Sequence, residues 1–312
     1  MRTALALLTL SLSACSAPLG GGAEPDADCA ANPDDADCAD TGAPTDGSGG
    51  DGDGSGGDDG SDGGDGDTGV GDGGDGSDGG DGSDGGDGSD GDDGSASGSG
   101  GSGGPVGTGA ASVGAVSYAY HVPSCVVDTT PAPVLFTQHG SGGTGSGMVD
   151  QWRALADAEC FIVIGQGSQS GEGWNFGSDV EGLGQLIDEV DRLWNIDTDR
   201  RVLHGYSAGA HWGYVIGLAN SATFGGLIVY AGAMAYADST GVWPGGTQGP
   251  IPVAIGHGTD DTVVPYAYAE QAEDRLTAAG WPVDLWTVSG GSHAYDADHQ
   301  AVAWAFVMDR ID

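Results

Sequence analysis

Apolar and polar positions follow two different rhythms along the last two thirds of the chain. Short runs rich in Val, Ile and aromatic residues predict strands, and longer runs with apolar residues three and four positions apart predict helices. The predicted strands are residues 115–122, 133–138, 160–165, 201–206, 224–232, 251–256 and 282–288. The predicted helices are residues 148–158, 179–194, 208–219, 266–279 and 297–310. This alternation indicates an α/β fold, with a mainly parallel central sheet covered by helices on both faces.

The first third of the chain lacks both rhythms. Residues 20–109 are dominated by Gly, Asp and Ser, and the hexad GGDGSD occurs three times in succession at 73–90. The stretch from Glu24 to Asp93 holds 24 acidic side chains and no basic one. Such a composition cannot bury enough apolar surface to offset the entropy of ordering the chain. We therefore expect a disordered acidic tether at 15–111 and one folded domain at 112–312.

The Asp/Gly repeat raises the alternative that the tether binds calcium. The hexad lacks the ligand order and closing Glu of an EF-hand, and it lacks the apolar position of the nonapeptide repeats that form β-rolls. A solvated spacer is the favoured interpretation, with calcium binding as the alternative. Because the net charge is −40 and the chain has no Lys, nucleic acid is not expected as a partner.

The N-terminus has the layout of a secretory signal. Residues 1–14 carry one positive charge, at Arg2, followed by an apolar run too short to span a bilayer. The run ends in LSAC, which resembles a bacterial lipobox, so we expect Cys15 to be acylated and to become the first mature residue. The protein is then exported and anchored to a membrane by its lipid. Ser16, in place of Asp, favours the outer membrane or the cell surface.

Four further cysteines remain in the exported chain. An even number in an oxidising compartment predicts two disulfides, most simply Cys29 with Cys38 and Cys125 with Cys160. Buried free thiols are the alternative for the second pair. No CxxC motif or Cys/His cluster is present, so the sequence predicts no metal site.

Two pentapeptides match the G-x-S-x-G pattern of an activated serine, one centred on Ser102 and one on Ser207. A chain so rich in Gly and Ser produces such matches by chance. Only Ser207 follows a predicted strand and precedes a predicted helix, and Gly205 and Gly209 are small where a tight strand-to-helix turn crowds the backbone. This context predicts a nucleophile at Ser207, whereas Ser102 falls in the expected tether.

A serine hydroxyl becomes a nucleophile when a histidine takes its proton and a carboxylate orients that histidine. His293 lies in a glycine-rich loop after the last predicted strand, and Asp260 and Asp261 follow the strand at 251–256. The order serine, acid, histidine is that of α/β-hydrolases. Chemistry alone does not decide which aspartate orients His293, because either one could cap the turn instead. His299 is the rival base, but we expect it on the closing helix as an exposed or capping residue.

Several segments together resemble the polyhydroxybutyrate depolymerase-like and feruloyl esterase-like α/β-hydrolases. They are YHVPS, FTQHGSGG, GWNFGSDVEGLGQLIDEV, DTDRRVLHGYSAGAHWGYVIG, HGTDDTVVPY and GGSH. In that family the acid stands four residues before the Pro, which implies Asp261. Members cleave short polyesters, feruloyl or acetyl esters on plant polysaccharide, or small esters. The chain departs from the family by its short HGSGG loop, by His204 in place of a small or β-branched residue, and by lacking an appended polymer-binding domain, which argues against a polymeric substrate.

Acyl transfer also needs donors for the oxyanion. We expect the backbone N–H groups of Ser141, in QHGSGG, and of Ala208 to supply them. A phosphate-binding loop is excluded for this segment because that motif requires Lys. Trp174 and Phe176 are candidates for a substrate pocket, with core packing as an equal alternative, and Trp243 is a candidate for a lid over the site.

The sequence thus predicts a lipid-anchored serine esterase that forms an acyl-enzyme on an ester substrate and needs no cofactor. A serine peptidase of the same fold is the near alternative, since the same triad cleaves amides. A non-catalytic surface lipoprotein with a functional acidic tether is the other. The oligomeric state is not indicated. Five other histidines are expected to be hydrogen-bonded structural residues, namely His121, His139 (shaping the oxyanion loop), His204, His211 and His257.

Overall fold

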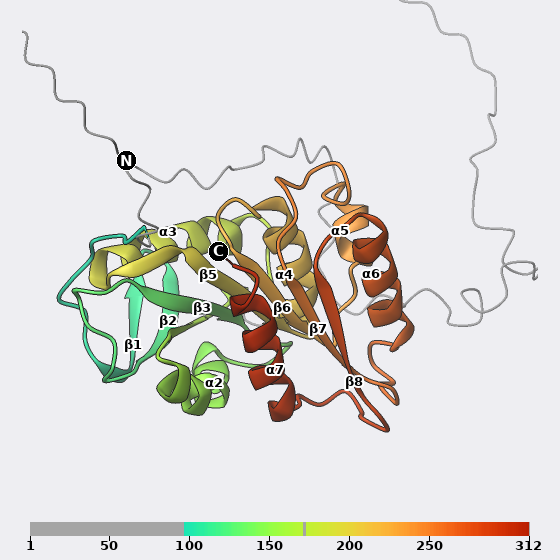
Figure 1. Ribbon diagram of the computed structural model, residues 1–312, viewed down its shortest axis with the longest axis horizontal. Helices are drawn as coiled ribbons and strands as arrows, with labels where there is room; N and C mark the ends of the chain where they lie inside the picture. The colour runs from blue at the N-terminus through green and yellow to red at the C-terminus, as the bar shows by residue number, and fades with distance from the viewer. Residues whose placement is uncertain (1–96, 171–172, 312) are drawn as a thin grey trace, which may run out of the picture. The chain divides into compact units, whose positions relative to one another are not determined.

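A computed structural model describes residues 97–170 and 173–311. In this part of the chain eight strands form one sheet in the order β1-β2-β4-β3-β5-β6-β7-β8 (Figure 1). Strand β2 pairs antiparallel with β1 and β4, and every other neighbouring pair is parallel. The prediction of a mainly parallel sheet is confirmed. The strands are β1 Gly107–Val113, β2 Val116–Val122, β3 Ala132–Gln138, β4 Ile162–Gln166, β5 Ile196–Tyr206, β6 Gly226–Tyr230, β7 Val253–Gly258 and β8 Val283–Val288.

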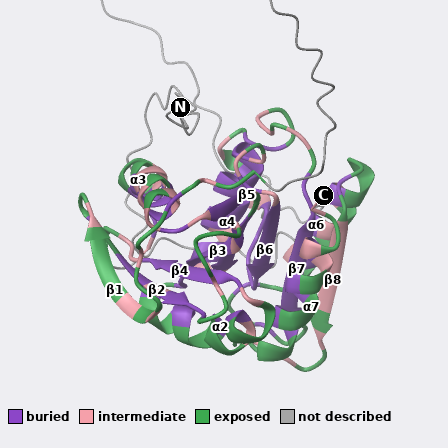
Figure 2. Cartoon of the chain, turned by 60° about the vertical axis from the view of Figure 1, so that its left-hand side comes forward, coloured by how far each residue is buried: buried purple, intermediate pink, exposed green. Residues whose placement is uncertain are grey.

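Helices cover both faces of the sheet. They are α2 Gly145–Glu159, α3 Ser178–Leu193, α4 Ala208–Ala219, α5 Ala235–Ser239, α6 Ala267–Ala278 and α7 Ala297–Met308. Helices α2 and α7 pack on one face around Trp152, Phe161 and Trp304. Helices α3, α4 and α6 pack on the other face, over a larger apolar core. The central strands are therefore buried on both sides, while β1 forms an exposed edge (Figure 2).

Helix α2 begins one turn before the predicted start at residue 148. Thr144 is its N-cap, and the Thr144 hydroxyl accepts the N–H of Gly147 at 3.1 Å. The glycines of the first turn hide the helical rhythm in the sequence, since they contribute no apolar side chain. The cap also determines where the preceding HGSGG loop ends, directly beside the sheet edge that carries the candidate site.

The structure corrects the boundary between tether and domain. Residues 97–111, which the composition assigned to the tether, belong to the folded unit. Strand β1 pairs with β2 along its whole length, and Gly98 forms an isolated bridge with Asp197. The rest of the predicted tether, together with Cys15, Cys29, Cys38 and the signal segment, lies outside the described residues.

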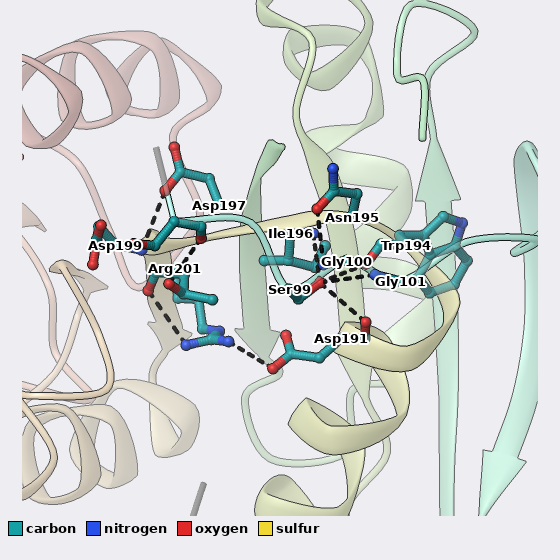
Figure 3. A network of polar contacts seen from close by, with 12 residues as sticks. Ser99, Gly100, Gly101, Asp191, Trp194, Asn195, Ile196, Asp197, Asp199 and Arg201 are labelled. Atoms are coloured by element: carbon teal, nitrogen blue, oxygen red, sulfur yellow. Dashed lines mark hydrogen bonds and ion pairs between the residues drawn. The ribbon is translucent and has the colours of Figure 1, made fainter. Parts of the chain in front are cut away.

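Side-chain and backbone contacts hold the first described residues against the end of α3. The Ser99 hydroxyl lies 3.0 Å from the carbonyl oxygen of Asp191 and 2.9 Å from that of Trp194, and it accepts the N–H of Ile196 at 2.9 Å (Figure 3). A Cβ at Gly101 would overlap both of those carbonyl oxygens. Glycine is needed here because two backbone segments approach closely, whereas composition suggested flexibility.

A disulfide joins Cys125, in the loop after β2, to Cys160, the C-cap of α2. The prediction for this pair is confirmed. Cys160 adopts a left-handed conformation with φ 59°, which ends the helix and turns the chain into β4. The bond thereby ties the antiparallel edge of the sheet to the helix that follows the HGSGG loop.

Removal of this disulfide should destabilise the domain measurably. Closing a loop of 35 residues restricts the unfolded chain, so the double substitution C125S/C160S is expected to lower the free energy of unfolding by about 3 to 4 kcal/mol. Urea unfolding followed by tryptophan fluorescence, with intact and doubly substituted protein compared, measures this change. A loss below about 1 kcal/mol would contradict the expectation.

No helix within residues 97–170 and 173–311 is long and apolar enough to cross a membrane. In the same ranges no three His, Cys, Asp or Glu side chains gather in a way that could hold a metal ion.

Candidate active site

Ser207 stands at the turn between β5 and α4 with φ 53° and ψ −119°, a backbone conformation that a non-glycine residue rarely adopts. The flanking glycines make the turn possible. A Cβ at Gly205 would overlap the carbonyl of Gly209, and a Cβ at Gly209 would overlap that of Gln138. The Ser207 N–H donates to the carbonyl of Tyr230 at 2.9 Å, which fixes the turn to the neighbouring strand. This is the geometry of a nucleophile elbow.

Three residues from separate loops meet at this elbow. The Ser207 Oγ lies 2.8 Å from His293 Nε2, and His293 Nδ1 lies 2.7 Å from Asp261 Oδ2. They follow β5, β7 and β8, whose carboxyl ends lie at the same edge of the sheet (Figure 1). Because a carboxylate only accepts, Nδ1 carries the ring proton and donates to Asp261, which leaves Nε2 free to accept the serine proton.

The Asp261 carboxylate is enclosed and well satisfied. Its Oδ1 accepts the N–H groups of Val263 and Val264, both at 2.8 Å, while Oδ2 accepts from His293. Burial acts to raise the pKa of this carboxyl, but the hydrogen bonds from His293, Val264 and Val263 outweigh it and hold the pKa below its ordinary value. Asp261 is therefore ionised next to His293.

Asp260, the other candidate for the triad acid, does not contact His293. It is exposed and accepts a hydrogen bond from the adjacent Thr259 hydroxyl at 3.2 Å. The structure thus brings Asp261, and not Asp260, to the histidine.

A second histidine, expected from the sequence only as a structural residue, touches the same carboxylate. His257 Nε2 lies 2.7 Å from the carbonyl of Val264 and 3.3 Å from Asp261 Oδ2. A carbonyl cannot donate, so Nε2 carries the proton and donates toward both oxygens. Burial lowers the pKa of His257, so the ring is neutral and holds Asp261 by a hydrogen bond. Its position four residues before Asp261 was the available signal.

The predicted oxyanion donors lie on the two segments that border Ser207. Ala208 is the first residue of α4, and a first-turn N–H has no carbonyl one turn earlier in its helix to bond. Ser141 is exposed in the loop after β3. The adjoining Gly140 approaches the nucleophile so closely that a Cβ there would lie 3.1 Å from the Ser207 Cβ. Ala208 thus follows the nucleophile directly in the chain, and Ser141 follows the glycine that approaches it.

Trp174 supports the oxyanion loop, the HGSGG segment that carries Ser141. Its indole Nε1 donates to the carbonyl of His139 at 2.9 Å, and its ring packs on Trp212 with centroids 5.0 Å apart. The Nδ1 of His139 lies 2.8 Å from the carbonyl of Gly140 and therefore donates to it. Trp174 is only 5% exposed. Of the two alternatives for this residue, the structure shows packing and support of the loop.

The other two candidate pocket residues also pack inward. Phe176 is half-buried against the larger core. Trp243 is 8% exposed and packs edge to face on Trp281, with ring centroids 5.4 Å apart. It is therefore part of the core and not of a lid over the site. The stretch before Trp243 contains the short helix α5, which was not predicted because it is too brief to show a helical rhythm.

A cavity of about 520 Å³ opens beside the oxyanion loop. It lies between that loop, the start of α2 and strands β1 and β2, and hydroxyl groups are prominent in its walls. The hydroxyl-bearing and imidazole residues are Ser112, Ser117, Tyr118, His139, Thr144, Ser146 and Ser168.

The five histidines expected to be structural all make hydrogen bonds, as predicted. Their partners are Thr108 and Asp157 for His121, Gly140 for His139, Thr137 and Tyr295 for His204, Ala233 for His211 and Val264 for His257.

The expectation for His299 was wrong. It is 1% exposed, packs on Tyr230 with centroids 5.3 Å apart, and neither ring nitrogen has a hydrogen-bond partner among the described residues. A polar residue near the start of a helix is usually predicted to be exposed, but in α7 this position faces β6 and β7. Glycine at 256 makes room for it, since a Cβ there would lie 2.8 Å from the imidazole.

Burial of His299 should make the domain sensitive to acid. Burial lowers its pKa from 6.5 to about 4, so the unfolded chain binds a proton that the folded protein excludes between these values. Stability is therefore full above about pH 6.5 and is lost as the pH falls toward 4. Between pH 7 and pH 4.5, H299L should lose about 2.5 kcal/mol less stability than the unsubstituted protein in urea unfolding. Equal losses would contradict this assignment.

Sheet order, elbow and triad geometry define an α/β-hydrolase. Residues 175–308, which include Ser207, Asp261 and His293, match the family model described as phospholipase/carboxylesterase. The chain thus has the α/β-hydrolase fold, and its C-terminal segment is similar to the phospholipase/carboxylesterase family.

Comparisons with individual proteins agree with this class. The chain is 29% identical over 150 residues to a bifunctional acetylxylan esterase/xylanase of Neocallimastix patriciarum, a match that covers 45% of this chain and 21% of that protein. The chain thus spans about a fifth of the length of this curated relative.

Solved structures show the same fold. S-formylglutathione hydrolase of Staphylococcus aureus is 14% identical, with 64% of this chain and 96% of that one covered and a TM-score of 0.51. A thermophilic esterase of Thermogutta terrifontis is 14% identical, with 65% and 92% covered and a TM-score of 0.51. A CE1 ferulic acid esterase of Anaeromyces mucronatus is 16% identical, with 66% and 90% covered and a TM-score of 0.50. At these identities the likeness establishes the fold.

Proposed function

We propose that this chain is a serine esterase. The observation that carries the proposal is the hydrogen bond of 2.8 Å between Ser207 Oγ and His293 Nε2 at a strained elbow. In the first step the Ser207 oxygen bonds to the ester carbonyl carbon while Nε2 takes the hydroxyl proton. The tetrahedral intermediate then expels the alcohol, which receives that proton from His293. Water, deprotonated by the same nitrogen, hydrolyses the acyl-enzyme and releases the acid.

The surroundings of the triad support each step. The ionised Asp261 stabilises the imidazolium that forms during proton transfer. The N–H groups of Ser141 and Ala208 would donate to the oxygen that becomes negative in the intermediate. Each step of this mechanism uses groups that the protein itself supplies.

The substrate we propose is a small or polysaccharide-linked acetyl or feruloyl ester rather than a long polyester. Proteins that the chain resembles carry acetylxylan esterase and ferulic acid esterase in their names. The cavity beside the loop that carries Ser141 is lined by no triad residue, so we propose that it holds a group attached to the ester rather than the ester itself; its volume suits a sugar-sized group, and its hydroxyl groups can hydrogen-bond a polar one.

A substrate panel tests the proposal. The purified domain would be assayed with p-nitrophenyl acetate and butyrate, methyl ferulate, acetylated xylan, a polyhydroxybutyrate suspension and aminoacyl p-nitroanilides. We expect turnover of acetyl or feruloyl esters and none of the anilides. Faster cleavage of the anilides would indicate a peptidase, and inertness of the folded domain toward all of them would indicate a non-catalytic lipoprotein.

We also propose that the hydrolase is exported and held at a membrane by a lipid on Cys15. The support is the LSAC sequence at the end of the short apolar leader. In an expressing bacterium, radiolabelled palmitate should enter the intact protein and not C15S, and C15S should leave the membrane fraction. Equal labelling of both proteins would contradict the anchor.

A further inference from the structure

The loop that carries His293 is the least regular part of the catalytic arrangement. It joins β8 to α7 and contains two glycines, at 290 and 291, which only Ser292 separates from the histidine. Because glycine allows many backbone conformations, the loop sequence alone does not keep the imidazole within hydrogen-bonding distance of Ser207. Contacts from outside the loop must therefore fix His293. The loop after β7 supplies two, from the Asp260 N–H to the carbonyl of Gly291 and from the Gly290 N–H to the Thr259 hydroxyl, both at 2.8 Å. Two further contacts involve residues of β5.

The first contact comes from Tyr206, the residue directly before the nucleophile. Its hydroxyl donates to the backbone carbonyl of His293 at 3.1 Å. Its ring also stacks on the imidazole, with centroids 5.5 Å apart and planes 28° from parallel. Tyr206 thus constrains both the backbone and the ring of the base.

The second contact holds the loop two residues further on. The Tyr295 hydroxyl lies 3.2 Å from His204 Nε2, and His204 Nδ1 lies 2.7 Å from the Thr137 hydroxyl. Gln300 adds a weaker bond to the same Tyr295 oxygen at 3.4 Å. His204 is fully buried, and burial lowers its pKa well below the ordinary value. The ring therefore stays neutral, with one nitrogen that donates and one that accepts, and each has a partner.

Both contacts originate in the strand that delivers the nucleophile. Positions 204 and 206 of β5 lie on the same face of the sheet because side chains alternate along a strand. The rings of Tyr206 and Tyr295 also meet edge to face at 5.6 Å. Strand β5 therefore supplies the serine and two of the attachment points for the loop of its base, so the distance between them depends in part on one rigid element.

We propose that His204 and Tyr206 are positioning residues that clamp the His293 loop through Tyr295 and the His293 carbonyl. The inference rests on the proposed esterase function, because it gives His293 the role of base. It also accounts for His204, a fully buried histidine whose two ring nitrogens bond to Thr137 and Tyr295. A base displaced by about 1 Å can cost about a hundredfold in rate, so such a clamp has a measurable effect.

Deletion of single hydroxyl groups tests the clamp. Y206F and Y295F remove the hydrogen bonds but keep the rings and their packing. Y214F is the matched control, since the Tyr214 hydroxyl is buried in α4 and has no hydrogen-bond partner among the described residues. Each variant would be assayed for kcat and KM on the best ester of the panel, with active sites titrated and thermal unfolding measured.

We expect Y206F and Y295F each to lower kcat about tenfold with KM within twofold of the parent, and Y214F to leave kcat unchanged. The doubly substituted protein should lose less than the product of the single losses, since both bonds hold one loop. All variants should melt well above the assay temperature.

If Y206F and Y295F keep the kcat of Y214F while the parent is active, or if they raise KM and leave kcat unchanged, the clamp is refuted. An inactive parent protein would instead refute the proposed esterase, which keeps the two failures distinguishable. A variant that melts below the assay temperature would be compared at a lower temperature where all five proteins are folded, and the same criteria would apply there.

Discussion

Replacement of Ser207 by alanine is expected to lower kcat for ester hydrolysis by about 10⁶-fold. The hydroxyl is the atom that bonds to the acyl carbon, and no neighbouring side chain replaces it at the elbow. H293A should cost about as much, because an unactivated serine is a poor nucleophile. The S207A/H293A protein should be no slower than either single variant, since the triad acts as a unit. Initial rates with a p-nitrophenyl ester at equal folded protein concentration measure all three.

Ser102 provides the matched control for this experiment. It lies at the centre of the same sequence pattern but is exposed in the segment that packs near the end of α3. S102A should retain parental kcat. If S207A kept more than a few per cent of the parental rate, or if S102A shared its loss, the nucleophile would have to be sought elsewhere.

D261N should lower kcat by about 10⁴-fold. The amide that replaces the carboxylate can present an N–H to His293 Nδ1, which favours the wrong tautomer and removes the charge that stabilises the imidazolium. D260N is isosteric in the same way and adjacent in sequence, but Asp260 is exposed and bonds to Thr259. We expect D260N to stay within about twofold of the parent. Equal losses in the two variants would contradict the assignment of the acid.

The parallel core of the fold could be predicted because its signals are local. Continuous Val- and Ile-rich runs such as IVIG in β4 are typical of strands buried on both faces, and they alternate with amphipathic helices. Strand β1 was missed because GTGAASV has little apolar content and one face open to solvent. Its stability comes from pairing with β2, a long-range contact that composition cannot show.

The triad residues could be predicted because each follows a strand, and the ends of parallel strands lie at one edge of the sheet. Ser207, an aspartate and His293 each follow a strand of the parallel part of the sheet, namely β5, β7 and β8, so the sheet brings them to one edge. The choice between Asp260 and Asp261 as the triad acid rested on the family resemblance. The contacts that orient Asp261 are hydrogen bonds from the backbone N–H groups of Val263 and Val264, which the sequence does not reveal. The contacts of Tyr206 and His204 with the histidine loop span about 90 residues and leave no local trace.

Covalent labelling of the full chain with a fluorophosphonate probe, followed by mass spectrometry of its peptides, tests the central claim most directly. The probe reacts with a serine only when a base activates it and an oxyanion site accepts its phosphoryl oxygen. We predict one adduct per chain, on the peptide that contains Ser207, and none in S207A. A folded protein that stays unlabelled, or carries its adduct on another serine, would contradict the claim that Ser207 is the nucleophile of an esterase.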